Sequence, residues 1–109
     1  MPDVTSDERG RRIFQIKKER AVEMAVEKIR QNLGSEWAKL SQQDIRTLTD
    51  ILGEAWVLLE RSIWEQSSFT RLSKQDVVEI IRIGNDVKNK NIREENAINQ
   101  ICTILKSSI

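Results

Sequence analysis

Two helix starts of the same design decide the fold: Leu40-Ser41-Gln42-Gln43-Asp44-Ile45 and Leu72-Ser73-Lys74-Gln75-Asp76-Val77. In each, the Ser hydroxyl can accept a hydrogen bond from the backbone N–H three residues later, where an Asp can bond back to the Ser N–H. The Leu before each Ser is placed to act as a hydrophobic staple. These starts predict helices at about 42–66 and 74–88, and an all-α fold.

Two more capping boxes extend the helical pattern to both ends of the chain. Thr5-Ser6-Asp7-Glu8 is expected to open a first helix that runs to Leu33, behind a flexible arm of residues 1–6. Asn91-Ile92-Arg93-Glu94 is expected to open the last helix, and Gly34 to end the first before a short helical turn. We expect residues 7–109 to form a single compact bundle of four to five helices, with antiparallel neighbours.

The two starts lie 32 residues apart, a period in the range of helical-hairpin repeats. After the caps, the match between residues 40–52 and 72–84 falls to shared apolar positions. Two copies are also fewer than a solenoid needs to bury its faces. We therefore favour two helices that begin alike because capping has few solutions. A true repeat stays the alternative.

The first helix carries apolar side chains on two sides. At 3.6 residues per turn, one face forms a core stripe of Phe14, Ala21, Val22, Ala25, Val26, Ile29 and Leu33. Ile13, Ile16 and Met24 fall on the opposite side, among basic residues. A helix with two apolar sides generally has two neighbours, so these three side chains are predicted to bind a partner or a second copy.

Composition argues against catalysis and metal binding. The chain has no histidine, the usual general base near neutral pH and a common metal ligand, and one cysteine, Cys102, between apolar neighbours. We expect no catalytic residue, no metal site, no cofactor and no small-molecule substrate. The longest apolar run, 55–59, is far below the roughly 20 residues that span a bilayer. A cytoplasmic protein without membrane contact is the expectation.

Charge is nearly balanced overall but concentrated locally. The net charge is +1, yet residues 9–20 set six basic side chains against the carboxylate of Glu19: Arg9, Arg11, Arg12, Lys17, Lys18 and Arg20. A weaker basic group follows at Lys88, Lys90 and Arg93. Such clusters predict contacts to the phosphate backbone of nucleic acid, without sequence specificity because no base-reading motif is present. A solvated helix face is an equally good interpretation, and the pI of 7.9 is low for a dedicated nucleic-acid binder.

Three tryptophans stand out in a chain without tyrosine. Trp56 lies on an apolar stripe and is expected in the core. Trp37 and Trp64 lie near predicted helix ends, where an indole either covers the core or docks a partner. The core edge is favoured for both, and Trp64 is kept as a candidate partner-binding residue.

This small helical profile, with a basic helix beside surplus apolar side chains, resembles the small subunit of CRISPR effector complexes. The resemblance implies a helical bundle that serves antiviral defence, stacks against larger subunits or copies of itself, and holds single-stranded nucleic acid through Lys and Arg. It assigns strand binding to the two basic groups and stacking to Ile13, Ile16 and Met24. The alternative is a protein-only adaptor or regulator, in keeping with the near balance of 18 basic and 17 acidic residues.

Overall fold

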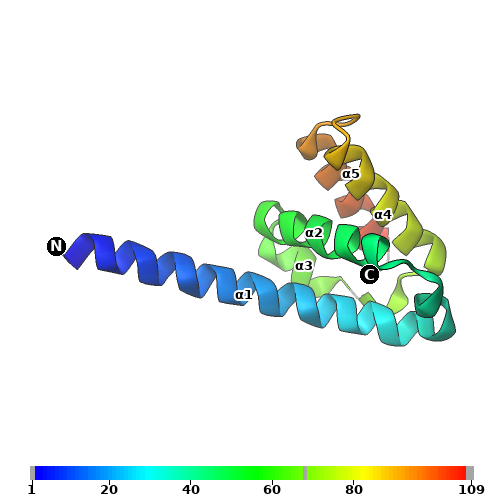
Figure 1. Ribbon diagram of the computed structural model, residues 1–109, viewed down its shortest axis with the longest axis horizontal. Helices are drawn as coiled ribbons and strands as arrows, with labels where there is room; N and C mark the ends of the chain where they lie inside the picture. The colour runs from blue at the N-terminus through cyan, green and yellow to red at the C-terminus, as the bar shows by residue number, and fades with distance from the viewer. Residues whose placement is uncertain (1, 68, 108–109) are drawn as a thin grey trace.

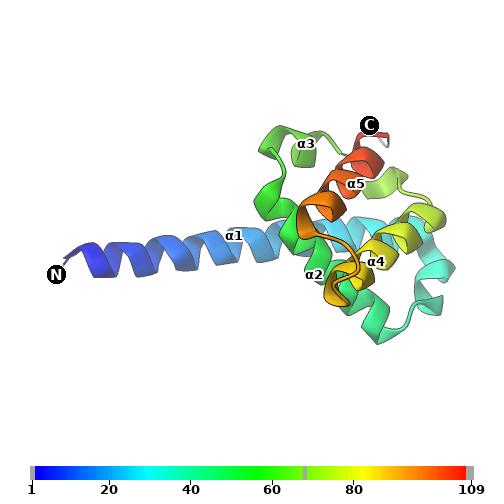
Figure 2. The ribbon, with the colours of Figure 1, turned by 90° about the horizontal axis from the view of Figure 1, so that it is seen from above.

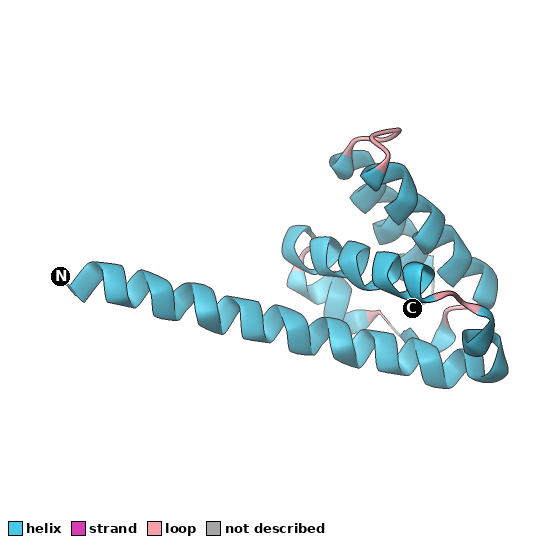
Figure 3. Ribbon diagram, in the orientation of Figure 1, coloured by secondary structure: helices cyan, strands magenta, loops and turns pink. Residues whose placement is uncertain are grey.

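One helix, α1, is much longer than the others and lies along one side of them (Figure 1). The computed structural model describes the backbone of residues 2–67 and 69–107, and the side chains of this range from residue 9 onward. The elements are α1 (Pro2–Leu33), the 3-10 turn η1 (Gly34–Lys39), α2 (Gln42–Leu58), α3 (Arg61–Gln66), the 3-10 turn η2 (Phe69–Arg71), α4 (Lys74–Lys88) and α5 (Glu94–Ser107). Helices and their connections account for all the described backbone (Figure 3), which confirms the predicted all-α bundle.

Both predicted helix starts are formed as full capping boxes. The Ser41 hydroxyl accepts the Asp44 N–H at 3.0 Å, and the Asp44 carboxylate accepts the Ser41 N–H at 3.3 Å. The same two bonds join Ser73 and Asp76, each at 3.1 Å. Because these caps satisfy backbone donors that the first turn leaves unpaired, α2 and α4 begin where the sequence predicts.

Two pairs of neighbouring helices run in opposite directions, as predicted. In Figure 1, α2 returns antiparallel to α1, and α5 returns antiparallel to α4. Helix α4 packs across α2 and also contacts α5 (Figure 2). Fully buried side chains from all four long helices fill the space between them: Ile29, Leu48, Leu52, Ile80, Ile83, Ile101 and Leu105.

The crossing of α2 and α4 depends on a glycine. A Cβ at Gly84 would lie 2.8 Å from the Thr47 methyl and 3.3 Å from the Ile51 Cβ, so the two backbones approach more closely than alanine permits. Thr47 is fully buried, and its hydroxyl donates to Asn85 at 3.3 Å. The glycine and the buried hydroxyl together fix how α4 lies on α2.

The second long helix is shorter than predicted. It ends at Leu58 rather than near Gln66, because Leu59 and Glu60 adopt extended backbone before α3 begins. The break turns Trp64 inward, where it is 8% exposed and its ring lies 5.0 Å from that of Phe69. The structure therefore supports the predicted place of Trp64 in the core. The prediction that Trp64 binds a partner is wrong, because its indole is buried.

The first helix begins earlier than predicted. Its backbone is helical from Pro2, so residues 2–6 of the expected arm belong to α1, while residue 1 of that arm and residues 108–109 of the expected domain lie outside the described residues. Proline is favoured at the first position of a helix, and nothing between Pro2 and Gly10 stops one. The last helix begins later than predicted. Residues 91–94 were expected to open it as a capping box, but α5 starts only at Glu94.

Candidate nucleic-acid interface

The N-terminal half of α1 projects beyond the rest of the molecule. A helix of 32 residues is about 48 Å long at 1.5 Å per residue, close to the 51 Å longest dimension of the protein. Figures 1 and 2 show this half extending away from the bundle in both views. The described side chains on it, from residue 9 onward, therefore meet solvent on most sides.

The predicted basic cluster lies on this projecting half and the turn next to it. Arg9, Arg11, Arg12, Lys17 and Arg20 are exposed, and none of them forms an ion pair with another side chain that the structure describes. Several cations of the bundle are paired instead. Lys74 lies 2.6 Å from Glu36, and Arg82 lies 3.0 Å from Asp86 and also pairs with Glu79. Unpaired cations are free to contact a polyanion, whereas paired ones first have to lose a partner.

Lys18 differs from its neighbours in the cluster. Its side chain lies against α2, with its Cε 3.0 Å from where a Cβ on Gly53 would be. It is only partly exposed. The sequence places Lys18 in the basic cluster, but the packing of α1 on α2 turns its side chain toward the bundle. Lys18 is therefore not among the cations that face outward.

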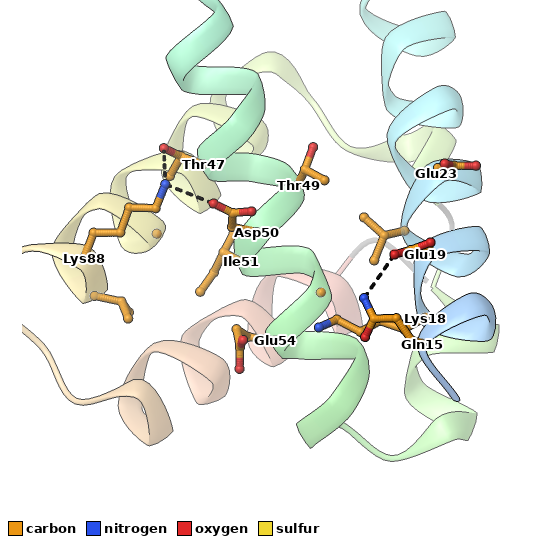
Figure 4. Close-up of a pocket in the computed structure, with 14 residues that line it drawn as sticks. Gln15, Lys18, Glu19, Glu23, Thr47, Thr49, Asp50, Ile51, Glu54 and Lys88 are labelled. Carbon is orange, nitrogen blue, oxygen red and sulfur yellow. Dashed lines mark hydrogen bonds and ion pairs between the residues drawn. The ribbon is translucent and has the colours of Figure 1, made fainter. Parts of the chain in front are cut away.

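An acidic groove of about 510 Å³ lies between α1, α2 and α4 (Figure 4). Its lining includes four carboxylates against two lysines: Glu19, Glu23, Asp50, Glu54, Lys18 and Lys88. Lys88 lies 3.2 Å from Asp50 and donates to the Thr47 hydroxyl at 3.2 Å. Lys88 is therefore engaged inside an acidic site, which is a poor environment for a phosphate.

The rest of the second basic group stands apart from the first. Lys90 and Arg93 are exposed at the turn between α4 and α5, and Lys90 has a left-handed φ of 60°. In Figure 1 this turn lies at the top of the molecule, whereas α1 runs along the bottom. The structure does not bring the two predicted basic groups onto one surface.

A second hollow, of about 580 Å³, opens between α1 and α3 and is lined by more basic than acidic side chains. Lys17, Lys28 and Arg61 lie on it with Glu65, over Trp56, Trp64 and Phe69. Lys28 and Arg61 were not expected from the sequence. Lys28 follows Lys17 by 11 residues, about three helical turns, and this spacing could have placed it on the same side of α1. Arg61 lacks such a signal, because it depends on the break before α3.

The indoles of Trp56 and Trp64 are buried and offer no open face for stacking bases. Trp56 is 4% exposed, with the Arg61 guanidinium 3.9 Å from its ring centroid and the Phe14 ring at 5.1 Å. Phe14 itself, predicted in the core, is 46% exposed because it lies where α1 leaves the bundle. The predicted partner-facing residues Ile13, Ile16 and Met24 are exposed by 54%, 46% and 61%.

The carboxylates of Glu54 and Glu94 interact, and the interaction shifts the pKa of Glu54. A hydrogen bond shared with Glu94 raises the pKa of Glu54, and burial and the neighbouring negative charges act in the same direction. Among the described residues there is no group of three His, Cys, Asp or Glu side chains arranged to hold a metal ion.

Comparisons with protein-family models, with curated proteins and with solved structures find no match. None of the described helices is both long and apolar enough to cross a membrane.

Proposed function

We propose that this protein is a non-catalytic helical subunit of a larger assembly, which binds the sugar-phosphate backbone of nucleic acid through the N-terminal half of α1. The observation that supports this best is the set of cations at Arg9, Arg11, Arg12, Lys17 and Arg20, which are exposed and without a described ionic partner. A projecting helix carrying such charges can approach a phosphate chain without the bundle obstructing it.

The proposed contact is to phosphates rather than bases. Backbone contact needs only cations at reachable positions, whereas base recognition without hydrogen-bond motifs needs aromatic faces for stacking. Trp56 and Trp64 are buried. Lys28 and Arg61, beside Lys17, extend the proposed phosphate path from the cluster toward α3.

The test is the salt dependence of binding to a single-stranded oligonucleotide. In a variant with Arg11, Arg12 and Lys17 changed to Ala, we expect the slope of log K against log salt to fall by about 0.7 for each lost contact. A matched control replaces Arg30, Lys39 and Arg82, which are already in ion pairs, and is expected to keep the wild-type slope. Equal affinity and slope in both variants would contradict the proposal.

A protein-only adaptor is the second candidate, and the exposed apolar side chains Ile13, Ile16 and Met24 favour it. In that function the cations of α1 would face an acidic protein surface. Binding of the oligonucleotide to a filter-held protein at low salt separates the two, because even weak backbone binders retain nucleic acid there. No retention would favour the adaptor.

The resemblance to the small subunit of CRISPR effector complexes is a narrower form of the same proposal. It adds stacking against larger subunits, a held strand, a role in antiviral defence and a cytoplasmic location. These stay predictions, supported by the helical architecture and by the exposed cations of α1, which have no ionic partner among the described side chains.

A further inference from the structure

The side of α1 that faces away from the bundle carries a continuous exposed stripe, here called the outer stripe. It lies opposite the buried residues Val22, Ala25 and Ile29 of the same helix. Its members are Arg9, Arg12, Ile13, Ile16, Arg20, Glu23, Met24 and Glu27, all of them exposed. Glu23 lies at one edge of the stripe, where it also lines the acidic groove, and Met24 lies at the other edge, where it also lines the second hollow. In Figure 1 the other helices all lie on one side of α1, so the outer stripe is open to a neighbour along its length.

The charges of the outer stripe are ordered along the helix. Arg9 and Arg12 come first, Ile13, Ile16 and Arg20 follow, and Glu23 and Glu27 come near the end. A second copy packed in the parallel direction would place Arg against Arg and Glu against Glu. A second copy packed in the antiparallel direction would place the basic end of each helix against the acidic end of the other, which charge complementarity favours.

The spacing of these residues also suits a twofold arrangement. Arg9 and Glu27 are 18 residues apart, which is five helical turns, while Arg12 and Glu23, like Ile13 and Met24, are 11 apart, about three turns. The two members of each pair therefore lie on one line along the helix. All three pairs are centred within half a residue of position 18. One twofold axis near that position would bring both members of these three pairs opposite their complements in the second copy.

We propose that two copies of the chain form an antiparallel dimer through the outer stripes of α1. Arg9 meets Glu27 of the second copy, Arg12 meets its Glu23, and Ile13 meets its Met24, each contact occurring twice by symmetry. Arg11 and Lys17 lie away from the centre of the stripe and stay accessible to phosphates in the dimer, whereas Arg9 and Arg12 are open to phosphates only in the monomer. This dimer does not rest on the proposed nucleic-acid function, because its contacts are between protein side chains.

Sedimentation equilibrium without nucleic acid tests the dimer, with Arg12→Glu and Glu23→Arg as the informative variants. Glu27 is less suitable because it already pairs with Arg30. Within one chain, positions 12 and 23 are about 16 Å apart along the helix and do not contact each other. Each variant alone should dimerise about tenfold more weakly, since two like-charge contacts replace two favourable ones.

An equimolar mixture of the two variants should restore dimerisation. In the mixed dimer, the glutamate introduced at position 12 of one chain meets the arginine introduced at position 23 of the other, while the native pair forms at the second contact. Arg46→Glu, on the exposed surface of α2, serves as the charge-reversal control and should dimerise like wild type. Circular dichroism checks that each variant is folded. A wild type that stays monomeric at all concentrations, or a mixture no stronger than its components, would overturn the proposal.

Discussion

At the residue scale, Gly84 is the position where adding a single methyl group has the clearest predicted effect on stability. The added Cβ of alanine would meet the Thr47 methyl at 2.8 Å, and Thr47 cannot move aside because it is buried and bonded to Asn85 and Lys88. We expect Gly84→Ala to lower the free energy of unfolding by about 1–2 kcal/mol, since overpacking outweighs the gain in helix propensity. Urea denaturation measures the change.

Gly53 on α2 provides the control, because it faces α1 rather than α4. A Cβ there would lie 3.0 Å from the Lys18 Cε, near the far end of a flexible side chain that can move, and 4.0 Å from a Val22 methyl, which is an ordinary contact. Gly53→Ala should therefore leave stability unchanged or raise it by up to about 1 kcal/mol through helix propensity. Equal destabilisation in both variants would show that the α2–α4 crossing does not depend on the small residue at 84.

Single residues also mark the limit of what the sequence could predict about the site. The exposure of Ile13, Ile16 and Met24 follows from their helical spacing, and the structure confirms that they are exposed. The environments of Lys18 and Lys88 could not be predicted, because Gly53, Asp50 and Thr47 meet them from another helix. A run of basic residues in the sequence locates candidate cations. Only the packing of the helices decides which of these cations already contact other residues of the protein.

At the element scale, the two capping boxes should each contribute measurably to stability. Ser73→Ala removes the acceptor for the Asp76 N–H at the start of α4, and Ser41→Ala does the same for α2. We expect each to cost about 1 kcal/mol in the free energy of unfolding.

Ser73→Asp, which keeps a side-chain acceptor at the cap, should recover most of the loss. Ser35→Ala, in the exposed turn η1, is the control for a hydroxyl without a capping role. The comparison uses thermal melting followed by circular dichroism. If Ser35→Ala costs as much as Ser73→Ala, the caps do not set the stability of these helices.

The caps also explain which element boundaries could be predicted. The starts of α2 and α4 were predicted because capping is local chemistry between residues three apart. The end of α2 was not, because no glycine or proline marks residues 59–60. That break accompanies the burial of Trp64 and the packing of α3 on α5, which are tertiary contacts that a local sequence pattern does not reveal.

At the scale of the whole molecule, Glu54 on α2 and Glu94 on α5 should make stability depend on pH in an unusual direction. The pKa of Glu54 is raised, so the folded state holds its proton more tightly than the unfolded chain does. Its contribution to stability is complete below the ordinary glutamate pKa and is lost as pH rises through the raised value. Near neutral pH, the two carboxylates repel each other.

Glu54→Gln should therefore stabilise the protein near pH 7, by roughly 0.5 kcal/mol for an exposed like-charge pair, and have no effect near pH 4. Glu36 acts in the opposite direction, because bonds from Lys74 and Lys39 lower its pKa and its contribution is lost as pH falls. Melting temperatures of wild type, Glu54→Gln and the neighbouring control Glu95→Gln across this pH range decide the matter. If the melting temperatures of wild type and Glu54→Gln differed by the same amount at all pH values, the predicted repulsion between Glu54 and Glu94 would be contradicted.

The projecting half of α1 has a consequence for how binding could be observed. Isolated helices shorter than about 12–15 residues are marginal in water, and Gly10 weakens this one further. Without support from the bundle, we expect the amides of residues 9–13 to open locally and exchange with deuterium faster than those of the buried half. Any occupant that lies along this segment, whether a phosphate chain or a second copy, would slow that exchange. The rate at these amides is thus a direct gauge of whether α1 is occupied.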